Sequence, residues 1–114
     1  MNEVETKPWG KYEILLDEEQ TKVKKISINP GHKFSYQSHE KRDEYWTIIN
    51  GELNITLDGQ EFIISYGESI SIPRNSKHRA HNNTDEVVEF VEVQTGLYFG
   101  EDEIVRYEDD YGRT

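Results

Sequence analysis

The amino-acid sequence predicts a single all-β domain that closes into a sandwich or barrel. Turn signals recur at short, even intervals, the segments between them alternate apolar and polar residues, and helix signals are scarce. A chain of 114 residues is long enough for one domain and too short for two. Closure would remove the exposed edges that about nine short strands would otherwise present to solvent.

The individual strands are predicted from the turns that bound them. Pro30-Gly31 turns the chain because proline presets the first turn angle and glycine accepts positive φ. Asn50-Gly51 and Asp58-Gly59 are typical two-residue hairpin turns, so the strands around them form a meander. Pro73 marks a further turn. In chain order, the predicted strands are residues 11–16, 21–29, 34–39, 44–49, 52–57, 60–65, 69–72, 77–82 and 87–94.

One domain is predicted to span residues 1–114. We expect an N-terminal arm over about residues 1–10 and a wrapping segment over about residues 96–114, with one helical turn around residues 102–105. Apolar residues make up 33 % of the chain, a small supply for one core. We therefore expect a homodimer, whose interface adds to the buried surface.

The charge and composition exclude several classes of partner and site. The net charge is −10, from 23 acidic and 13 basic residues, and it repels nucleic acid and anionic lipid, so neither partner is expected. A phosphorylated ligand would need a local positive cluster of metal, lysine or arginine. The chain has no cysteine, which excludes disulfides and thiolate ligands. It also has no apolar run of membrane-spanning length, so we expect a soluble, cytoplasmic protein.

Four residues in two stretches have the spacing of metal ligands. Gln37 and His39 are two apart on a predicted strand, so their side chains leave the same face. Glu44 begins the strand after the next loop, and His78 lies near the start of the strand after Pro73. Two imidazoles, one carboxylate and one amide oxygen suit one divalent ion such as zinc, manganese, cobalt, nickel or iron.

Two glycine-bounded motifs give these residues a family resemblance. Gly31, Gln37, His39, Glu44 and Gly51 fall at the intervals of the first cupin motif, with glutamine in place of the first histidine. The second cupin motif is matched by Gly67, Pro73, Asn75, His78 and Asn82, with Asn75 where a glycine is usual. The chain therefore resembles the cupins, whose fold is a double-stranded β-helix or jelly-roll barrel.

More narrowly, the chain resembles the C-terminal domain of type II mannose-6-phosphate isomerases, bifunctional enzymes that also carry a mannose-1-phosphate guanylyltransferase domain. The similar segments, which together cover nearly all of residues 7–113, are KPWGKYE, KVKKISINPG, SYQSHEKRDEYWTIINGE, SIPRNSKHR and EVQTGLYFGEDEIVRYEDDYGR. We expect a free-standing copy of this isomerase domain. In that family glutamine is usual at the position of Gln37, and His39, Glu44 and His78 match the other metal ligands.

The resemblance implies a metal-dependent aldose–ketose isomerase that interconverts mannose 6-phosphate and fructose 6-phosphate through an enediolate. It places Arg42 on an arginine implicated in activity, where it would clamp the phosphate or stabilise the enediolate. Lys24 is the second catalytic candidate, because it shares a strand face with Ile26 and Ile28 and would face the interior as a base or phosphate ligand.

Each of these residues also has a simpler interpretation. Gln37 could satisfy a backbone amide, Lys24 could extend to water, and Arg42 could pair with a surface carboxylate. Two other function classes stay open as well. A cupin of this kind could be a non-catalytic module that binds a sugar or sugar phosphate, or it could be another cupin enzyme, such as an iron dioxygenase or a metal-free epimerase.

Overall fold

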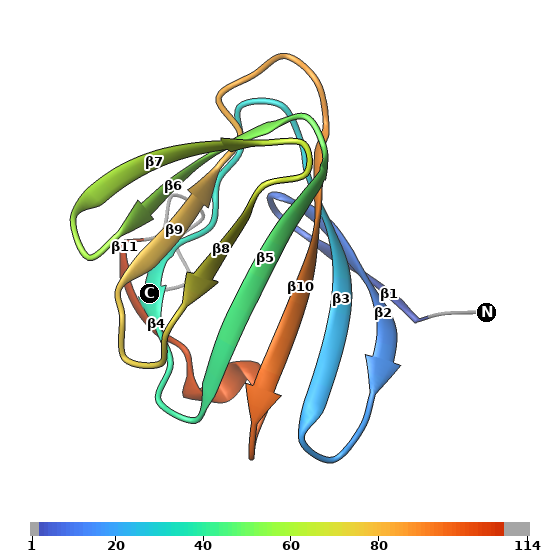
Figure 1. The fold of residues 1–114 in the computed structure, drawn as a ribbon, viewed down its shortest axis with the longest axis vertical. Helices are drawn as coiled ribbons and strands as arrows, with labels where there is room; N and C mark the ends of the chain where they lie inside the picture. Colours follow the sequence, from blue (N-terminus) through green and yellow to red (C-terminus); the bar gives the residue numbers. More distant parts are fainter. Residues whose placement is uncertain (1–2, 109–114) are drawn as a thin grey trace.

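The computed structural model describes residues 3–108, and over this range the protein is a two-layer all-β barrel (Figure 1). Its elements are β1 (Val4–Lys7), β2 (Gly10–Asp17), β3 (Thr21–Ile28), β4 (Tyr36–Ser38), β5 (Arg42–Asn50), β6 (Glu52–Leu57), β7 (Gln60–Ser65), β8 (Ser69–Ile72), β9 (His78–His81), β10 (Val88–Gly96), the 3₁₀ helix η1 (Glu101–Glu103) and β11 (Val105–Glu108). The predicted fold class is confirmed.

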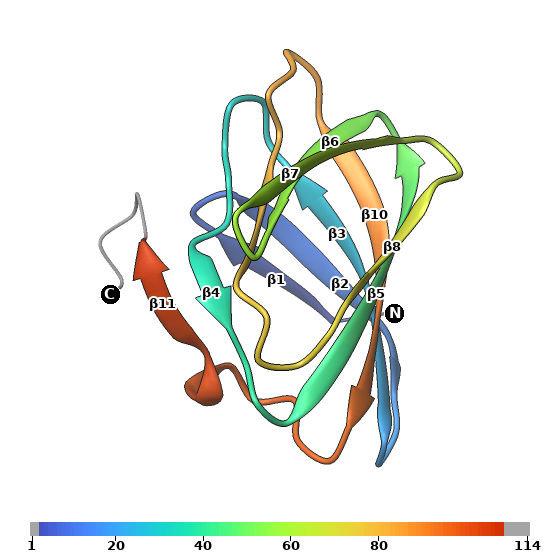
Figure 2. The same cartoon turned by 60° about the vertical axis from the view of Figure 1, so that its left-hand side comes forward.

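The strands form two antiparallel sheets that face each other. One sheet has the order β1-β2-β3-β10-β5-β8, and the other has the order β11-β4-β9-β6-β7. Figure 2 shows the two sheets as opposite walls, with β4 and β11 on the side away from β2 and β3. The predicted hairpin at Asp58-Gly59 joins β6 to β7, and both residues have positive φ there. The predicted hairpin at Asn50-Gly51 is wrong, because β5 and β6 belong to different sheets and this turn passes the chain from one sheet to the other.

The two ends of the chain are more regular than the sequence indicated. The residues predicted to form an N-terminal arm include strand β1, which pairs with β2, and Trp9, which is buried in the core. This part of the prediction is corrected, because the local sequence shows no partner for so short a strand. The C-terminal segment contains η1 at the predicted helical turn and then β11, which pairs with β4. Residues 109–114 lie outside the described residues.

The interior changes character along the strands, and this change positions the site. Every second residue of β5 and β10 faces inward, as the alternating burial shows. Toward one end of β5 these residues are Trp46 and Ile48, which pack with Phe90 and close a dry apolar core. Toward the other end they are buried polar groups, namely Arg42 and Glu44 of β5 and Glu92 and Gln94 of β10. One end of the barrel is therefore a core and the other a polar chamber.

Gly10 provides a test of how closely β2 and β3 approach each other. Its φ is +154°, and a Cβ at this position would lie far inside van der Waals contact with the backbone carbonyl oxygen of Ser27. Gly10→Ala is expected to lower the free energy of unfolding by about 2–4 kcal/mol, because backbone cannot move aside as a flexible side chain can.

The matched control is Gly59→Ala, since Gly59 also has positive φ but a Cβ there meets nothing within 4 Å. This change should cost about 1–2 kcal/mol, the backbone penalty alone. Urea denaturation of the two variants compares them directly, and equal losses would contradict the close approach at Gly10.

Candidate metal centre

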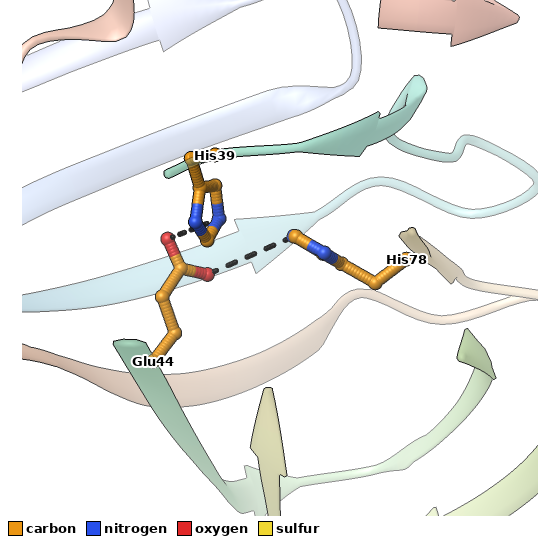
Figure 3. A group of neighbouring side chains, drawn as sticks. All are labelled: His39, Glu44 and His78. Atoms are coloured by element: carbon orange, nitrogen blue, oxygen red, sulfur yellow. Dashed lines mark ion pairs between the residues drawn. The ribbon is translucent and has the colours of Figure 1, made fainter. Parts of the chain in front are cut away.

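Three of the four predicted ligands converge at one buried point. His39 follows β4, Glu44 lies in β5 and His78 begins β9, and their ligand atoms all lie within 4.8 Å of one another. Figure 3 shows both imidazoles directed at the Glu44 carboxylate. His39 Nε2 is 3.1 Å from Glu44 Oε2, and His78 Nε2 is 4.0 Å from Glu44 Oε1. All three side chains are shielded from solvent.

The backbone fixes which nitrogen of each histidine faces the carboxylate. His39 Nδ1 lies 3.3 Å from the Arg42 carbonyl oxygen, and His78 Nδ1 lies 3.1 Å from the Ser76 carbonyl oxygen. A carbonyl oxygen only accepts, so each Nδ1 carries the proton and each Nε2 presents a lone pair. This is the tautomer in which histidine binds a metal ion through Nε2.

The resulting arrangement calls for a cation. Among residues 3–108, the buried Nε2 atoms of His39 and His78 have no hydrogen-bond partner. Each instead faces a carboxylate oxygen, so two kinds of acceptor meet without a donor between them. Unsatisfied buried polar atoms are rare and cost free energy, and a divalent ion bound here would satisfy all of these atoms at once. The three residues therefore fit the predicted metal.

The ionisation states also suit a metal ligand set. Burial is the main cause that lowers the pKa of His78, so this imidazole is neutral at pH 7. Burial opposes ionisation of Glu44, but the adjacent Arg42 guanidinium, which donates to Glu44 Oε2, favours the charged form, and the pKa of this carboxyl lies well below its usual value. The pocket thus offers a neutral imidazole and a carboxylate, the forms that bind metal.

Gln37, the fourth predicted ligand, lines the same chamber. Its Cα is directly opposite that of His78 in the β4–β9 pair, so the two side chains share a face of the sheet. The Ser35 hydroxyl donates to Gln37 Oε1 over 2.8 Å. Because an amide oxygen has two lone pairs, this bond leaves one for a further contact. Its part in the ligand set stays a prediction.

The structure places both predicted catalytic cations inside the barrel. Arg42 is 3 % exposed, and its Nε donates to Glu44 Oε2 over 2.9 Å. Its Nη1 donates to the carbonyl oxygens of Phe99 and Gly100 over 3.1 and 3.4 Å. Arg42 therefore neutralises Glu44 and holds the C-terminal segment, which leaves little of it for a phosphate. Lys24 is 5 % exposed, and its ammonium lies 4.1 Å from the centre of the Tyr12 ring.

Two polar residues of the chamber were missed in the sequence, Glu92 and Gln94 on β10. Gln94 Nε2 donates to Glu92 Oε1 over 2.7 Å and to Glu44 Oε2 over 3.3 Å. Trp46 Nε1 donates to carboxylate oxygens of both Glu44 and Glu92. Alternation along β10 puts them on one face with Phe90, and a glutamate on a core-facing strand is the signal that could have identified them.

The stability of the metal-free protein should fall as pH rises because of Glu92. Burial, with the charge of Glu44, raises the pKa of Glu92 to about 8 from the usual 4.5. Between these two values the folded protein keeps a proton that the unfolded chain releases, so the free energy of unfolding decreases as pH rises through this range. Glu92→Gln is expected to stabilise the chelator-treated protein on the order of 2 kcal/mol at pH 8.5, and to have little effect near pH 4.5.

Denaturant titrations at several pH values measure this difference. Glu89→Gln is the control, because Glu89 lies on the opposite face of the same strand. A stability gap between Glu92→Gln and the unaltered protein that stays constant with pH would contradict the burial of a proton at Glu92.

A cavity of about 50 Å³ lies beside Glu44 and Gln37, with room for a few water molecules. It is covered by the C-terminal segment, residues 97–108, which contributes part of its wall. The residues that line it are Lys7, Trp9, Tyr12, Lys24, Ile26, Phe34, Ser35, Gln37, Arg42, Glu44, Glu92, Gln94, Glu101, Ile104 and Arg106. Two of the candidate metal ligands, Gln37 and Glu44, therefore face a chamber that contains both charged and aromatic groups.

Solved structures with similar folds include an RmlC-like cupin from Shewanella frigidimarina, with a TM-score of 0.76 and 20 % identity. The capsular polysaccharide assembling protein CapF of Staphylococcus aureus aligns over 96 % of this chain and 35 % of its own, with a TM-score of 0.84 and 14 % identity. KdgF from a Halomonas species aligns over 86 % of both chains, with a TM-score of 0.77 and 15 % identity. These similarities show the fold, and the predicted cupin fold is confirmed.

The described residues include no helix long and apolar enough to cross a membrane.

Relatives in sequence are longer bacterial proteins. The mannose-1-phosphate guanylyltransferase of Salmonella montevideo is 42 % identical over 107 residues, and the alginate biosynthesis protein AlgA of Pseudomonas aeruginosa is 40 % identical over 108. These matches cover 94 and 95 % of this chain but only 23 and 22 % of the relatives. The family described as "Mannose-6-phosphate isomerase C-terminal" matches residues 2–109. The chain belongs to this family, as its motifs predicted.

Proposed function

We propose that this protein is a metal-dependent isomerase that interconverts mannose 6-phosphate and fructose 6-phosphate. The observation that supports this function best is the convergence of two donor-free Nε2 atoms and the Glu44 carboxylate at the edge of a charged chamber. The family to which the chain belongs supplies the substrate class. A soluble sugar phosphate also fits a chamber whose wall includes lysine and arginine side chains.

In this reaction the residues of the site would have three separate roles, namely metal binding, positioning of a ligand and exclusion of water. His39, Glu44 and His78, with Gln37, would hold one divalent ion, which when bound acts as a Lewis acid toward charge that develops on the sugar oxygens. Arg42 is a positioning residue, because it fixes the Glu44 carboxylate through its Nε. The apolar core behind Trp46 excludes water from one side of the chamber.

Moving a proton between C1 and C2 requires a group within reach of both carbons. Glu92 and Lys24 are the two candidates beside the ligands, since both line the chamber and their Cα atoms are paired across β10 and β3. The structure thus adds Glu92 to the lysine that the sequence indicated. Glu92→Gln and Lys24→Met test the two candidates. The variant with the larger fall in kcat, measured at saturating substrate, identifies the residue that moves the proton.

The chamber must open for a sugar to enter. Its present volume of about 50 Å³ takes water molecules but not a hexose phosphate. Residues 97–104 are the part of the covering segment that can move, because they are held mainly by polar contacts, whereas β11 is paired with β4 and its Tyr107 packs against Tyr36. We therefore expect these residues to swing outward during each turnover.

An isomerase assay tests the function directly. The purified protein, loaded separately with manganese, cobalt and zinc, is mixed with mannose 6-phosphate, and fructose 6-phosphate is measured. Turnover that disappears with a chelator and returns with metal would support the proposal. Absence of turnover with all metals, together with tight binding of the sugar phosphate, would instead favour a non-catalytic binding module. Full activity in protein without bound metal would favour metal-independent chemistry.

A further inference from the structure

The cationic side chains that line the chamber have very different surroundings. Lys7 is paired with Glu5 over 3.1 Å and with Glu101 over 2.7 Å. The Arg42 guanidinium is bonded to Glu44 and to backbone carbonyls, and the Lys24 ammonium lies over the Tyr12 ring. Three of the four cations are therefore already engaged by neighbouring groups. The fourth is Arg106, on β11.

Arg106 presents a buried donor with no acceptor. Its Nε is shielded from solvent and has no hydrogen-bond partner within residues 3–108. Arg106 and Ile104 line the chamber, whereas Val105 and Tyr107 are 46 and 44 % exposed, so the segment alternates between the chamber and solvent. A buried guanidinium donor without an acceptor costs free energy, and an anionic oxygen in the chamber would satisfy it.

The position of Arg106 matches the length of an open-chain sugar phosphate. Arg106 is directly opposite Gln37 in the β11–β4 pair, and Gln37 is directly opposite His78 in the β4–β9 pair. The three residues thus form one row across three strands, with about 10 Å between the Cα atoms at its two ends. If C1 and C2 of a six-carbon sugar lie at the His78 end, its far end extends along this row toward Arg106.

We propose that Arg106 binds the phosphate group of the substrate and that it determines the preference for phosphorylated over unphosphorylated sugars. This inference rests on the proposed function and assigns the phosphate subsite within it. The planar guanidinium matches two phosphate oxygens, and in a protein of net charge −10 such a local cation is needed to hold a dianion. The subsite lies on β11, directly after the residues 97–104 that cover the chamber.

Binding of inorganic phosphate and of mannose 6-phosphate to the metal-loaded protein tests the inference. Calorimetry should show that Arg106→Gln weakens the binding of both ligands by about 30-fold or more, whereas Arg106→Lys retains part of the affinity because it keeps the charge. Arg74→Gln is the matched control, since Arg74 is 46 % exposed and pairs with Asp43 outside the chamber. Metal content and melting temperature should be unchanged in Arg106→Lys.

Kinetics provide the second readout. In Arg106→Gln, KM for mannose 6-phosphate should rise by about 30-fold or more with kcat changed only a few-fold, and turnover of unphosphorylated mannose should not change. Equal affinity of Arg106→Gln and the unaltered protein for both phosphate ligands would overturn the inference. Arginine-dependent binding without any isomerisation would uphold the subsite and reject the isomerase function, so the two proposals fail separately.

Discussion

His78→Ala is expected to abolish tight metal binding and, with it, isomerase activity. The change removes one of two imidazoles whose Nε2 atoms face the Glu44 carboxylate, so the candidate metal site loses one of its two nitrogen ligands. Loss of an outer contact to a metal ligand typically costs 10- to 100-fold in affinity, and loss of the ligand itself should cost more, at least about 100-fold. The rate with mannose 6-phosphate should fall at least as far.

The control for this experiment is His81→Ala. His81 ends the same strand that His78 begins, and its side chain lines a groove on the outer side of the sheet rather than the chamber. Metal content measured by elemental analysis and the assay rate should be unaffected there. Full metal occupancy in His78→Ala after dialysis would show that the ion, if any, binds elsewhere.

Arg42→Met is expected to destabilise the fold strongly, because it removes a buried positive charge. Arg42 is 3 % exposed, so its replacement leaves the Glu44 carboxylate buried beside no permanent cation. Removing one partner of a buried ion pair typically lowers the free energy of unfolding by about 3–5 kcal/mol. The same change also removes the hydrogen bonds to the carbonyl oxygens of Phe99 and Gly100, so the covering segment should become sensitive to proteolysis.

An adjacent ion pair offers a matched comparison. Asp43 is next to Arg42 in sequence but faces outward, and it pairs with Arg74 over 3.0 Å at the surface. Arg74→Met should leave stability almost unchanged, because exposed ion pairs are screened by water and salt. Chemical denaturation of chelator-treated samples measures both variants. Similar losses in the two would mean that Arg42 contributes no more than a surface charge.

Local patterns explain how much of this architecture could be predicted. The hairpin signal Asp58-Gly59 and the alternation along β5 depend on neighbouring residues, and both are confirmed in the structure. The same alternation put Glu44 on the inner face, and the motif spacing brought His39 and His78 toward it. Sequence reasoning works here because each residue's direction is fixed by its own strand.

The remainder depends on contacts between distant parts of the chain. β1 pairs with β2 but is too short to show a period, and β11 finds its partner β4 across more than 60 residues of sequence. For the same reason the contacts of Arg42 could not be predicted from the sequence. The carbonyl groups that engage it come from Phe99 and Gly100, whose position no local pattern reveals.

A single guanidinium joins the candidate metal ligands to the covering segment, and in the proposed isomerase this connection has a thermodynamic consequence. Arg42 contacts Glu44 through Nε and the carbonyl oxygens of residues 99–100 through Nη1. Because the guanidinium is a rigid plane, a shift of residues 99–100 also shifts the group that positions Glu44. A sugar that keeps the covering segment in place therefore also keeps the Glu44 carboxylate in position to bind the ion. By thermodynamic linkage, a bound ion strengthens the binding of the sugar by the same factor. In the proposed enzyme, the ion should therefore dissociate more slowly when the sugar is bound, and a bound ion should in turn slow the escape of the sugar.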